Sequence, residues 1–298
     1  MPTTQTSASE QEHVFIGIPC YNRPEGLART LTCLQKQSHE NWSVLISDNC
    51  SPNAAVEETA LAFTAKDTRI TYFKQPQNLG PKENFRYVVE QAKGPFFMWA
   101  SDDDYWEPSF IESNIAQLLK FDEAQLSFCT PQVVDENENE LIFYEGFSRF
   151  HFTNNRGHDC QRFIKDPEIL GKANLIYGIY RTSPVQSVVK NSWDLAWSND
   201  WGADVVFLYS FISRHPITAT DQKLLKKFVP PSVKIYPLRK HPKSYFIKSN
   251  RYASYLSRFK AVAPSAEFAE AAEKALRQRL RESRFYKFLS FFNVKTNR

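Results

Sequence analysis

The sequence lacks the closely spaced cysteines of a zinc-binding or disulfide-stabilised domain. Its five cysteines, an odd number, are scattered along the chain at Cys20, Cys33, Cys50, Cys129 and Cys160. Structural zinc sites need closely spaced ligands, and disulfide scaffolds need a dense, even set. Both classes are therefore excluded, and a reducing cytoplasm fits this cysteine usage best.

Long apolar runs and a strong excess of one charge are also missing. No stretch approaches the roughly 20 apolar residues that span a bilayer, and residues 1–12 do not have the basic and then apolar order of a signal peptide. With 37 Lys and Arg against 33 Asp and Glu, the net charge is +4. Composition therefore indicates a soluble or membrane-peripheral protein and gives no reason to expect a nucleic-acid partner.

What the sequence does contain is a repeated strand and helix pattern. Short apolar runs at 14–19, 44–46, 70–73 and 95–100 each end in polar or turn-forming residues, and a helical pattern follows each of them. Such runs predict an α/β domain with a mostly parallel central sheet covered on both faces. With 298 residues, the chain is long enough for one such domain plus a tail.

The second half of the chain predicts a different arrangement. A strand over 126–134 and an acidic turn over 135–140 indicate a hairpin into 141–144. We expect only loop from 147 to 166, helices around 205–212 and 265–292, and a strand over 233–236.

Polar residues stand at the carboxyl ends of the predicted strands. Asn22 and Asp48 follow the first two strands, and Asp102, Asp103 and Asp104 follow the fourth. Parallel sheets bind ligands at this edge, so we expect these residues to share one crevice. Three adjacent carboxylates repel one another, and Mn2+ or Mg2+ would offset that repulsion; a solvated acidic turn before a helix is the alternative.

Four motifs stand in order between residues 15 and 108: Ile18-Pro19-Cys20-Tyr21-Asn22-Arg23, Ile46-Ser47-Asp48-Asn49-Cys50-Ser51, Asn78-Leu79-Gly80 with Asn84, and Ser101-Asp102-Asp103-Asp104-Tyr105-Trp106-Glu107-Pro108. Together they resemble glycosyltransferase family 2, the inverting enzymes of GT-A fold. The resemblance implies a GT-A (Rossmann-like) domain over 13–245, with a donor half at 13–108 and an acceptor half at 109–245. Residues 1–12 are expected to be disordered, and 246–298 to form a C-terminal amphipathic helical extension.

The resemblance implies a donor site in the first half. Pro19, Tyr21 and Asn22 would line the nucleoside pocket, Asp48 would accept a hydrogen bond from the base, and Asp102 would lie against the ribose. The rest of the predicted donor-binding set is Arg23, Asn78, Lys82, Asn84, Asp103 and Arg239. Asp48 and the two asparagines could instead be turn or cap residues, and the lysine a surface charge.

The resemblance also suggests metal ligands. Family members often have Asp-x-Asp-Asp in the fourth motif, whereas this chain has Ser101 at the first position, so the ligand assignment shifts by one residue. Asp104 is favoured and Asp103 is the second choice. His241 lies in a segment that looks like the family's Arg-x-His motif and would be a metal or phosphate ligand; without that likeness it is a surface histidine.

On the acceptor side, the resemblance implies a carboxylate base at the start of a helix. Asp204 is the leading residue and Asp200 the reserve; either could instead be a helix N-terminal residue favoured by the dipole. Trp201, Tyr177 and Tyr180 are the predicted acceptor contacts. Core packing is the alternative for the tryptophans at 193, 197 and 201, and the glycine at 178 either admits a ligand or marks a bulge.

The predicted C-terminal helix combines an apolar face with positive charge. The apolar face comprises Leu276, Leu280, Phe285, Phe288, Leu289 and Phe292, and five basic residues lie between 277 and 287. Such a helix can lie in the headgroups of an anionic membrane, dock on the catalytic domain, or pair with a second copy as a homodimer.

These observations predict a metal-dependent inverting transferase. It would move a sugar from a nucleotide-diphosphate donor, with a UDP-sugar favoured, to a hydroxyl of a glycan or lipid-linked acceptor. The resemblance implies bacterial surface polysaccharide assembly in the cytoplasm or at the inner face of the cell membrane. A nucleotidylyltransferase is discounted because no Gly-rich phosphate loop follows the first strand. A non-catalytic nucleotide-sugar-binding or scaffold protein of the same fold is the alternative from another class.

Overall fold

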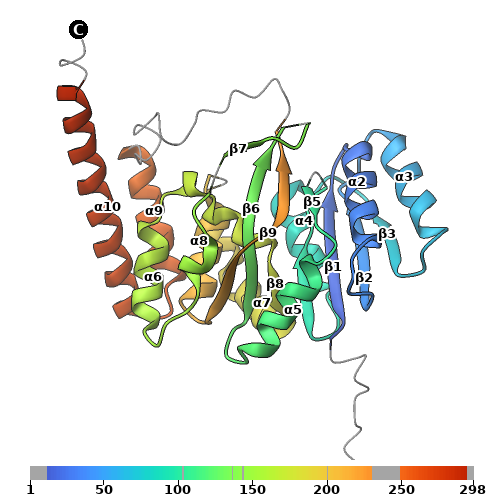
Figure 1. Ribbon diagram of the computed structural model, residues 1–298, viewed down its shortest axis with the longest axis horizontal. Helices are drawn as coiled ribbons and strands as arrows, with labels where there is room; N and C mark the ends of the chain where they lie inside the picture. The colour runs from blue at the N-terminus through green and yellow to red at the C-terminus, as the bar shows by residue number, and fades with distance from the viewer. Residues whose placement is uncertain are drawn as a thin grey trace, which may run out of the picture.

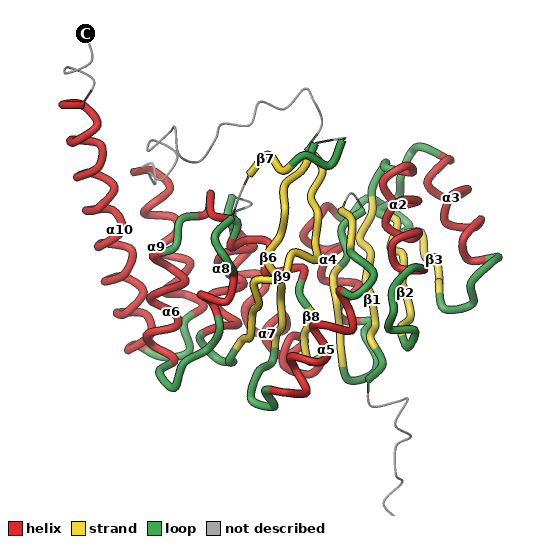
Figure 2. The backbone as a smooth tube through the Cα atoms, viewed as in Figure 1, coloured by secondary structure: helices red, strands yellow, loops and turns green. Residues whose placement is uncertain are grey.

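The computed structural model describes residues 12–102, 104–135, 137–142, 144–199, 201–229 and 249–293. Over these residues the chain forms a nine-stranded sheet, with α5 in front of it and α7 behind it in Figure 1. The strand order is β3-β2-β1-β4-β8-β6-β9-β5, and β7 pairs with β6. Figure 2 shows the same layers as strands between helices. The predicted α/β class with a mostly parallel central sheet is confirmed.

The first half of the sheet is parallel throughout. It contains β1 (Val14–Cys20), β2 (Trp42–Asp48), β3 (Ile70–Lys74) and β4 (Phe96–Trp99), connected by α2 (Pro24–Gln35), α3 (Ala54–Thr64) and α4 (Gly80–Glu90). Helix α4 packs closely on β1, because a Cβ at Gly17 would lie 2.6 Å from the Cβ of Val88. The carboxyl ends of these strands therefore meet at one edge, as predicted.

The second half of the sheet is mixed. It contains β5 (Asp104–Trp106), β6 (Leu126–Val134), β7 (Glu140–Ile142), β8 (Ile179–Arg181) and β9 (Ile217–Phe228), with α5 (Phe110–Lys120), α7 (Thr182–Ala196) and α8 (Ala203–Ile212). Strand β8 runs antiparallel to β4 and β6, whereas β9 runs parallel to β6 and antiparallel to β5. The hairpin of β6 and β7 matches the prediction, and β9 was not predicted. The predicted strand at 233–236 lies outside the described residues.

The prediction of loop over 147–166 is wrong. This segment forms the 3-10 helix η1 (Phe147–Phe150) and helix α6 (Arg156–Lys165). The side chain of Asn155 caps α6 by accepting a hydrogen bond from the backbone N–H of His158 at 2.9 Å. Helix α6 is short and mostly polar, and its buried residues, Asp159, Cys160, Phe163 and Ile164, lie at helical spacing on one face that packs against the distant C-terminal helix.

The C-terminal region contains two helices, α9 (Ser249–Val262) and α10 (Ala266–Asn293). Helix α10 packs on α6 and α9, as Figure 1 shows at the end of the molecule away from β3, and Leu276 on it is 0% exposed. The described part of its apolar face is therefore docked on the rest of the chain. Among the described residues, no helix combines the length and the apolar character needed to cross a membrane.

Candidate functional site

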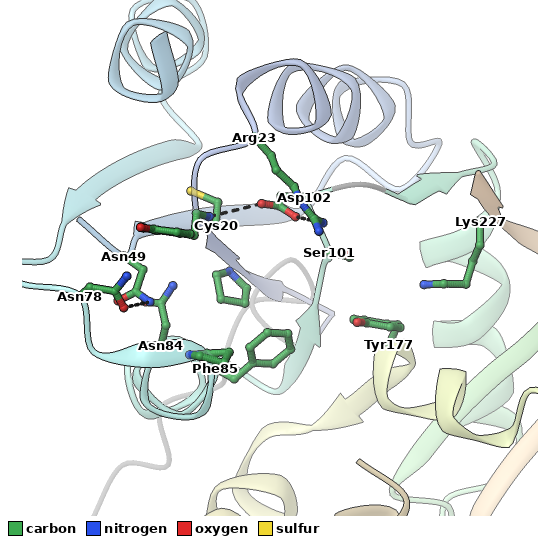
Figure 3. Close-up of a pocket in the computed structure, with 13 residues that line it drawn as sticks. Cys20, Arg23, Asn49, Asn78, Asn84, Phe85, Ser101, Asp102, Tyr177 and Lys227 are labelled. Atoms are coloured by element: carbon green, nitrogen blue, oxygen red, sulfur yellow. Dashed lines mark hydrogen bonds and ion pairs between the residues drawn. The ribbon is translucent and has the colours of Figure 1, made fainter. Parts of the chain in front are cut away.

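A pocket of about 510 Å³ opens at the carboxyl edge of the parallel strands (Figure 3). Its lining residues come from the ends of β1, β2 and β4, from the start of α4, and from β9 and the 3-10 helix η3 (Lys172–Tyr177). They are Pro19, Cys20, Tyr21, Arg23, Asn49, Asn78, Pro81, Asn84, Phe85, Ser101, Asp102, Tyr177 and Lys227. The structure thus brings six predicted donor residues and one predicted acceptor residue to the same pocket.

Asp102 anchors the loop between β1 and α2. The Asp102 Oδ2 atom accepts a hydrogen bond from the backbone N–H of Tyr21 at 3.4 Å, and Oδ1 lies 3.3 Å from Arg23 Nη1. Between these two residues Asn22 adopts a φ of 59°, which asparagine tolerates better than most side chains, and its N–H donates to Ser51 Oγ at 2.8 Å. The loop is therefore held against Asp102 at the pocket wall, and Asn22, a predicted donor residue, is not among the lining residues.

Asparagines build the opposite wall. Asn84 lies at the start of α4, and Asn78 accepts a hydrogen bond from the N–H of Gly80 at 2.8 Å. Asn49, which was not predicted, donates to Asn78 Oδ1 at 3.0 Å and accepts from the N–H of Leu79 at 2.7 Å. These asparagines both shape the turn before α4 and face the pocket. The available signal for Asn49 was its place directly after the end of β2, inside the second motif.

Besides Asn22, two further predicted donor residues do not line the pocket. Asp48 is fully buried and accepts hydrogen bonds from the Tyr72 hydroxyl at 2.8 Å and the Ser51 N–H at 2.9 Å. Lys82 turns toward α7, where its Nζ lies 2.5 Å from Asp194 Oδ1. The base contact of Asp48 and the phosphate contact of Lys82 stay predictions.

Asp104, the favoured metal ligand, faces a lysine from a strand that is distant in the sequence. Asp104 lies in β5, is 2% exposed, and has its Oδ2 atom 2.6 Å from Lys227 Nζ on β9. The same ammonium lies 4.7 Å from the ring centroid of Tyr177. Lys227 was not predicted, and its separation of 123 residues from Asp104 leaves no local signal for this pair.

The described carboxylates of the acidic stretch are of the chemical type that binds a divalent cation. Carboxylate oxygens such as those of Asp102 and Asp104 are the ligands that Mn2+ and Mg2+ prefer. In the part of the chain that the structure describes, Arg23 and Lys227 face these two carboxylates, and no group of three or more His, Cys, Asp or Glu residues could hold a metal. The predicted ligands and donor contacts Asp103, His241 and Arg239 lie outside the described residues.

The predicted base, Asp204, is not among the residues that line the pocket. Asp204 stands in the first turn of α8, and its Oδ1 atom accepts from the Val205 N–H at 2.8 Å. Burial raises the pKa of the Asp204 carboxyl above its usual 3.8, and the nearby carboxylate of Glu168 acts in the same direction. A raised pKa makes a carboxylate a stronger base. The reserve residue Asp200 lies outside the described residues.

Of the predicted acceptor contacts, Tyr177 reaches the pocket. Tyr180 is fully buried, and its hydroxyl donates to the Ile176 carbonyl at 3.2 Å. The ring of Trp201 packs on Tyr255, with centroids 4.6 Å apart. The tryptophan at 193 stacks in the core, so the regular spacing of the three tryptophans reflects packing at that position.

A buried charge network not predicted from the sequence lies close to Asp204. Lys172 is 0% exposed, and its Nζ donates to the carbonyls of Phe163 at 2.7 Å and Asp166 at 2.5 Å, at the end of α6. Burial lowers the pKa of Lys172 to about 8.

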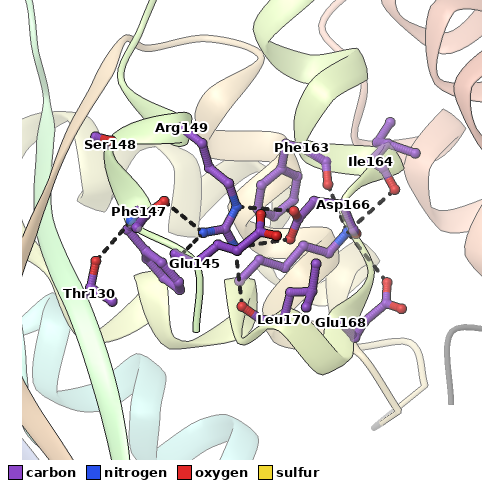
Figure 4. Close-up of polar contacts among 12 residues, drawn as sticks. Thr130, Glu145, Phe147, Ser148, Arg149, Phe163, Ile164, Asp166, Glu168 and Leu170 are labelled. Carbon is purple, nitrogen blue, oxygen red and sulfur yellow. Dashed lines mark hydrogen bonds and ion pairs between the residues drawn. The ribbon is translucent and has the colours of Figure 1, made fainter. Parts of the chain in front are cut away.

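The same network ties α10 to the rest of the chain. Arg279 of α10 pairs with Glu168. Figure 4 shows Arg149 facing Asp166, and Arg149 Nε lies 3.1 Å from Asp166 Oδ1. Burial alone would raise the pKa of Glu168, but Lys172 and Arg279 lower this pKa to about 2. The C-terminal helix is therefore joined by charge to the segment behind the predicted base.

The fold and the pocket define a GT-A domain, and solved structures share this fold. The chain aligns with S. aureus TarS residues 1–349 in complex with UDP-GlcNAc at a TM-score of 0.57 and 15% identity, over 90% of this chain and 71% of that one. It aligns with the mannosyltransferase PcManGT from Pyrobaculum calidifontis, in complex with GDP-Man and Mn2+, at a TM-score of 0.53 and 12% identity, over 91% and 72%.

The family model for glycosyl transferase family 2 matches residues 15–176, and the chain belongs to this family. An uncharacterized glycosyltransferase of Rickettsia typhi, RT0329, is 28% identical over 46% of this chain and 42% of its own length. The putative colanic acid biosynthesis glycosyl transferase WcaA of Escherichia coli is 30% identical over 35% and 37%. The putative teichuronic acid biosynthesis glycosyltransferase TuaG of Bacillus subtilis is 24% identical over 36% and 42%. The chain thus spans less than half the length of each of these relatives.

Proposed function

We propose that the chain is an inverting, metal-dependent glycosyltransferase that moves a sugar from a nucleotide-diphosphate donor to a hydroxyl of a glycan or lipid-linked acceptor. The observation that carries the proposal is the pocket at the carboxyl edge of the sheet, where Asp102 is held by Arg23 and by the Tyr21 N–H. A UDP-sugar is the favoured donor, because TarS has been solved with UDP-GlcNAc and with UDP. The names of WcaA and TuaG support bacterial surface polysaccharide as the context. The cytoplasm or the inner face of the cell membrane stays the predicted place.

In this proposal each wall of the pocket holds a different part of the donor. Tyr21, which is 44% exposed, offers a ring face to the base, and Asp102 lies in reach of the ribose. Arg23 and Lys227 bring positive charge to the same cavity and would attract the diphosphate. Asp104, with Asp103, would hold Mn2+ or Mg2+, and a bound cation would stabilise the charge of the departing diphosphate.

The second half of the chain supplies the base and the acceptor surface. The acceptor hydroxyl attacks the anomeric carbon as the bond to the diphosphate breaks, so the new bond forms on the opposite face and the configuration inverts. Asp204 takes the hydroxyl proton, and its raised pKa suits that role. Tyr177 lines the pocket and would contact the sugar or the acceptor.

A donor screen tests this function. UDP-, GDP- and dTDP-sugars are titrated with and without Mn2+ by calorimetry, on the wild type, on Asp102→Asn and on Asp122→Asn, whose side chain is 91% exposed. We expect one nucleotide class to bind the wild type in a metal-dependent manner. Its affinity for Asp102→Asn should be at least about ten-fold lower than for the wild type, and its affinity for Asp122→Asn should equal that for the wild type. Failure of every donor to bind would overturn the proposal. Binding without hydrolysis or transfer to any acceptor would favour the non-catalytic binding protein.

A further inference from the structure

Lys227 touches both a buried carboxylate and the open pocket. Strands β5 and β9 pair antiparallel, with Asp104 directly opposite Lys227, and the two side chains meet at 2.6 Å. Asp104 is 2% exposed, whereas Lys227 lines the pocket beside Tyr177 (Figure 3). The ammonium therefore stands between the carboxylate and the space that a donor would occupy.

Because Asp104 is buried, its carboxylate needs a positive charge beside it, so Lys227 can leave only if another cation takes its place. A buried carboxylate without a counter-charge is costly, and the lysine supplies that charge in the structure. Mn2+ or Mg2+ at Asp104 would supply it as well, but a metal and an ammonium at one carboxylate would repel each other. The two cations must therefore compete for Asp104.

The ammonium of Lys227 has an alternative contact in the pocket when it leaves the Asp104 carboxylate. Its four-carbon stem is flexible, and its Nζ already lies 4.7 Å from the ring centroid of Tyr177, whose face can hold a cation. Both residues line the same pocket as Arg23. An ammonium displaced from Asp104 thus remains in the cavity, where it can pair with a phosphate group.

We propose that Lys227 is the resident counter-ion of Asp104, that a divalent cation displaces it, and that the displaced ammonium then binds the donor's diphosphate. This inference rests on the proposed function, since it takes the pocket to be the donor site. It makes metal and donor binding cooperative, because each ligand favours the same position of Lys227, and such coupling is reciprocal. Lys227 is thereby a donor-binding residue as well as a competitor of the metal.

The test compares Lys227→Met with Lys226→Met. Lys226 is the next residue on β9, but it pairs with Glu107 and Glu138 and does not line the pocket. Mn2+ affinity is measured without nucleotide, by the electron paramagnetic resonance signal of free Mn2+. Affinities for UDP and UMP, or for GDP and GMP if the screen selects guanosine, are then measured with saturating Mn2+ by calorimetry.

Lys227→Met should bind Mn2+ about ten-fold more tightly than the wild type and the nucleoside diphosphate about ten-fold more weakly, with the monophosphate little affected. Lys226→Met should match the wild type in all three measurements. Lys227→Arg keeps the charge and should bind Mn2+ no more tightly than the wild type, which separates competition for Asp104 from a general disturbance of β9.

Unchanged or weaker Mn2+ binding by a folded Lys227→Met would overturn the exchange at Asp104, even if diphosphate binding fell. Equal losses for the diphosphate and the monophosphate would overturn the diphosphate contact. These failures differ from failure of the proposed function, in which the wild type itself binds no nucleoside diphosphate.

Discussion

Asn84 of α4 and Ser47 of β2 are joined by two hydrogen bonds, one in each direction. Ser47 Oγ donates to Asn84 Oδ1 at 2.6 Å, and Asn84 Nδ2 donates to the Ser47 carbonyl at 2.9 Å. Both residues are buried. The pair therefore fixes the N-terminal half of α4, which forms one wall of the pocket, against the carboxyl end of β2.

Asn84→Ala should lower the free energy of unfolding by about 1–3 kcal/mol, because it leaves the buried Ser47 carbonyl without this donor. Urea denaturation measures the change. Asn191→Ala is the control, since that side chain is exposed and bonds only locally, to the Ser187 carbonyl. Equal effects of the two substitutions would contradict a special role for the Asn84 pair.

Asp204→Asn should reduce kcat by about 100-fold or more, because an amide cannot take the acceptor proton. The raised pKa of Asp204 gives a second expectation. The base must be deprotonated, so wild-type kcat/KM should fall as the pH drops through a value above 3.8, and the variant should lose this acid limb. An identical acid limb in the variant would assign the titration to another group.

Glu168 should make the stability of the protein sensitive to acid. Lys172 and Arg279 hold its pKa at about 2, below the usual 4.5, despite its burial. The unfolded chain therefore binds more protons between these values, and the stability that the carboxylate contributes is full above pH 4.5 and is lost as the pH falls toward 2.

Glu168→Gln measures this contribution. At pH 7 the substitution should cost about 3 kcal/mol of unfolding free energy, since it leaves two buried cations without their carboxylate. The difference from the wild type should shrink as the pH falls below 4.5. Glu267→Gln changes an exposed carboxylate on α10 and should leave the unfolding curve unchanged. A difference that is constant from pH 7 to pH 3 would contradict the assignment.

Gly178 and Gly157 should respond oppositely to alanine. A Cβ at Gly178 would lie 2.5 Å from the Ser127 carbonyl oxygen, so β6 approaches too closely for a side chain, whereas a Cβ at Gly157 in α6 meets nothing closer than 3.4 Å. Gly178→Ala should therefore cost about 1–3 kcal/mol, and Gly157→Ala should be neutral or stabilise by up to about 1 kcal/mol. The stabilities of the two variants are compared with that of the wild type by thermal unfolding. The absence of a side chain at Gly178 thus leaves room for the backbone of β6 and not for a ligand.

Much of the donor half could be read from the sequence. Each of its strands is a continuous apolar run ended by polar residues, and parallel strands place those ends at one edge. Asp102, Tyr21 and Asn84 were placed at the pocket on that basis, together with the family resemblance, and the structure puts them in its lining.

In the second half, the hairpin of β6 and β7 and the helix α8 were predicted, but β9 and α6 were not, because they depend on partners distant in the sequence. Strand β9 contains lysines and forms by pairing with β6 and β5. Helix α6 packs against α10. Strand β9 lacks a regular alternation of apolar and polar residues, and α6 is short and mostly polar, although its apolar residues do lie at helical spacing. Lys172 looks like a surface lysine in the sequence, yet it is buried as the donor to the carbonyls that end α6.

The sequence by itself determined the α/β class, the family, and the edge of the sheet at which polar residues gather, because these depend on local patterns of apolar and polar residues. The tertiary structure alone decided which charges meet. Lys227 lies opposite Asp104, and Arg279 reaches Glu168, because strand register and helix docking bring residues more than 100 positions apart into contact.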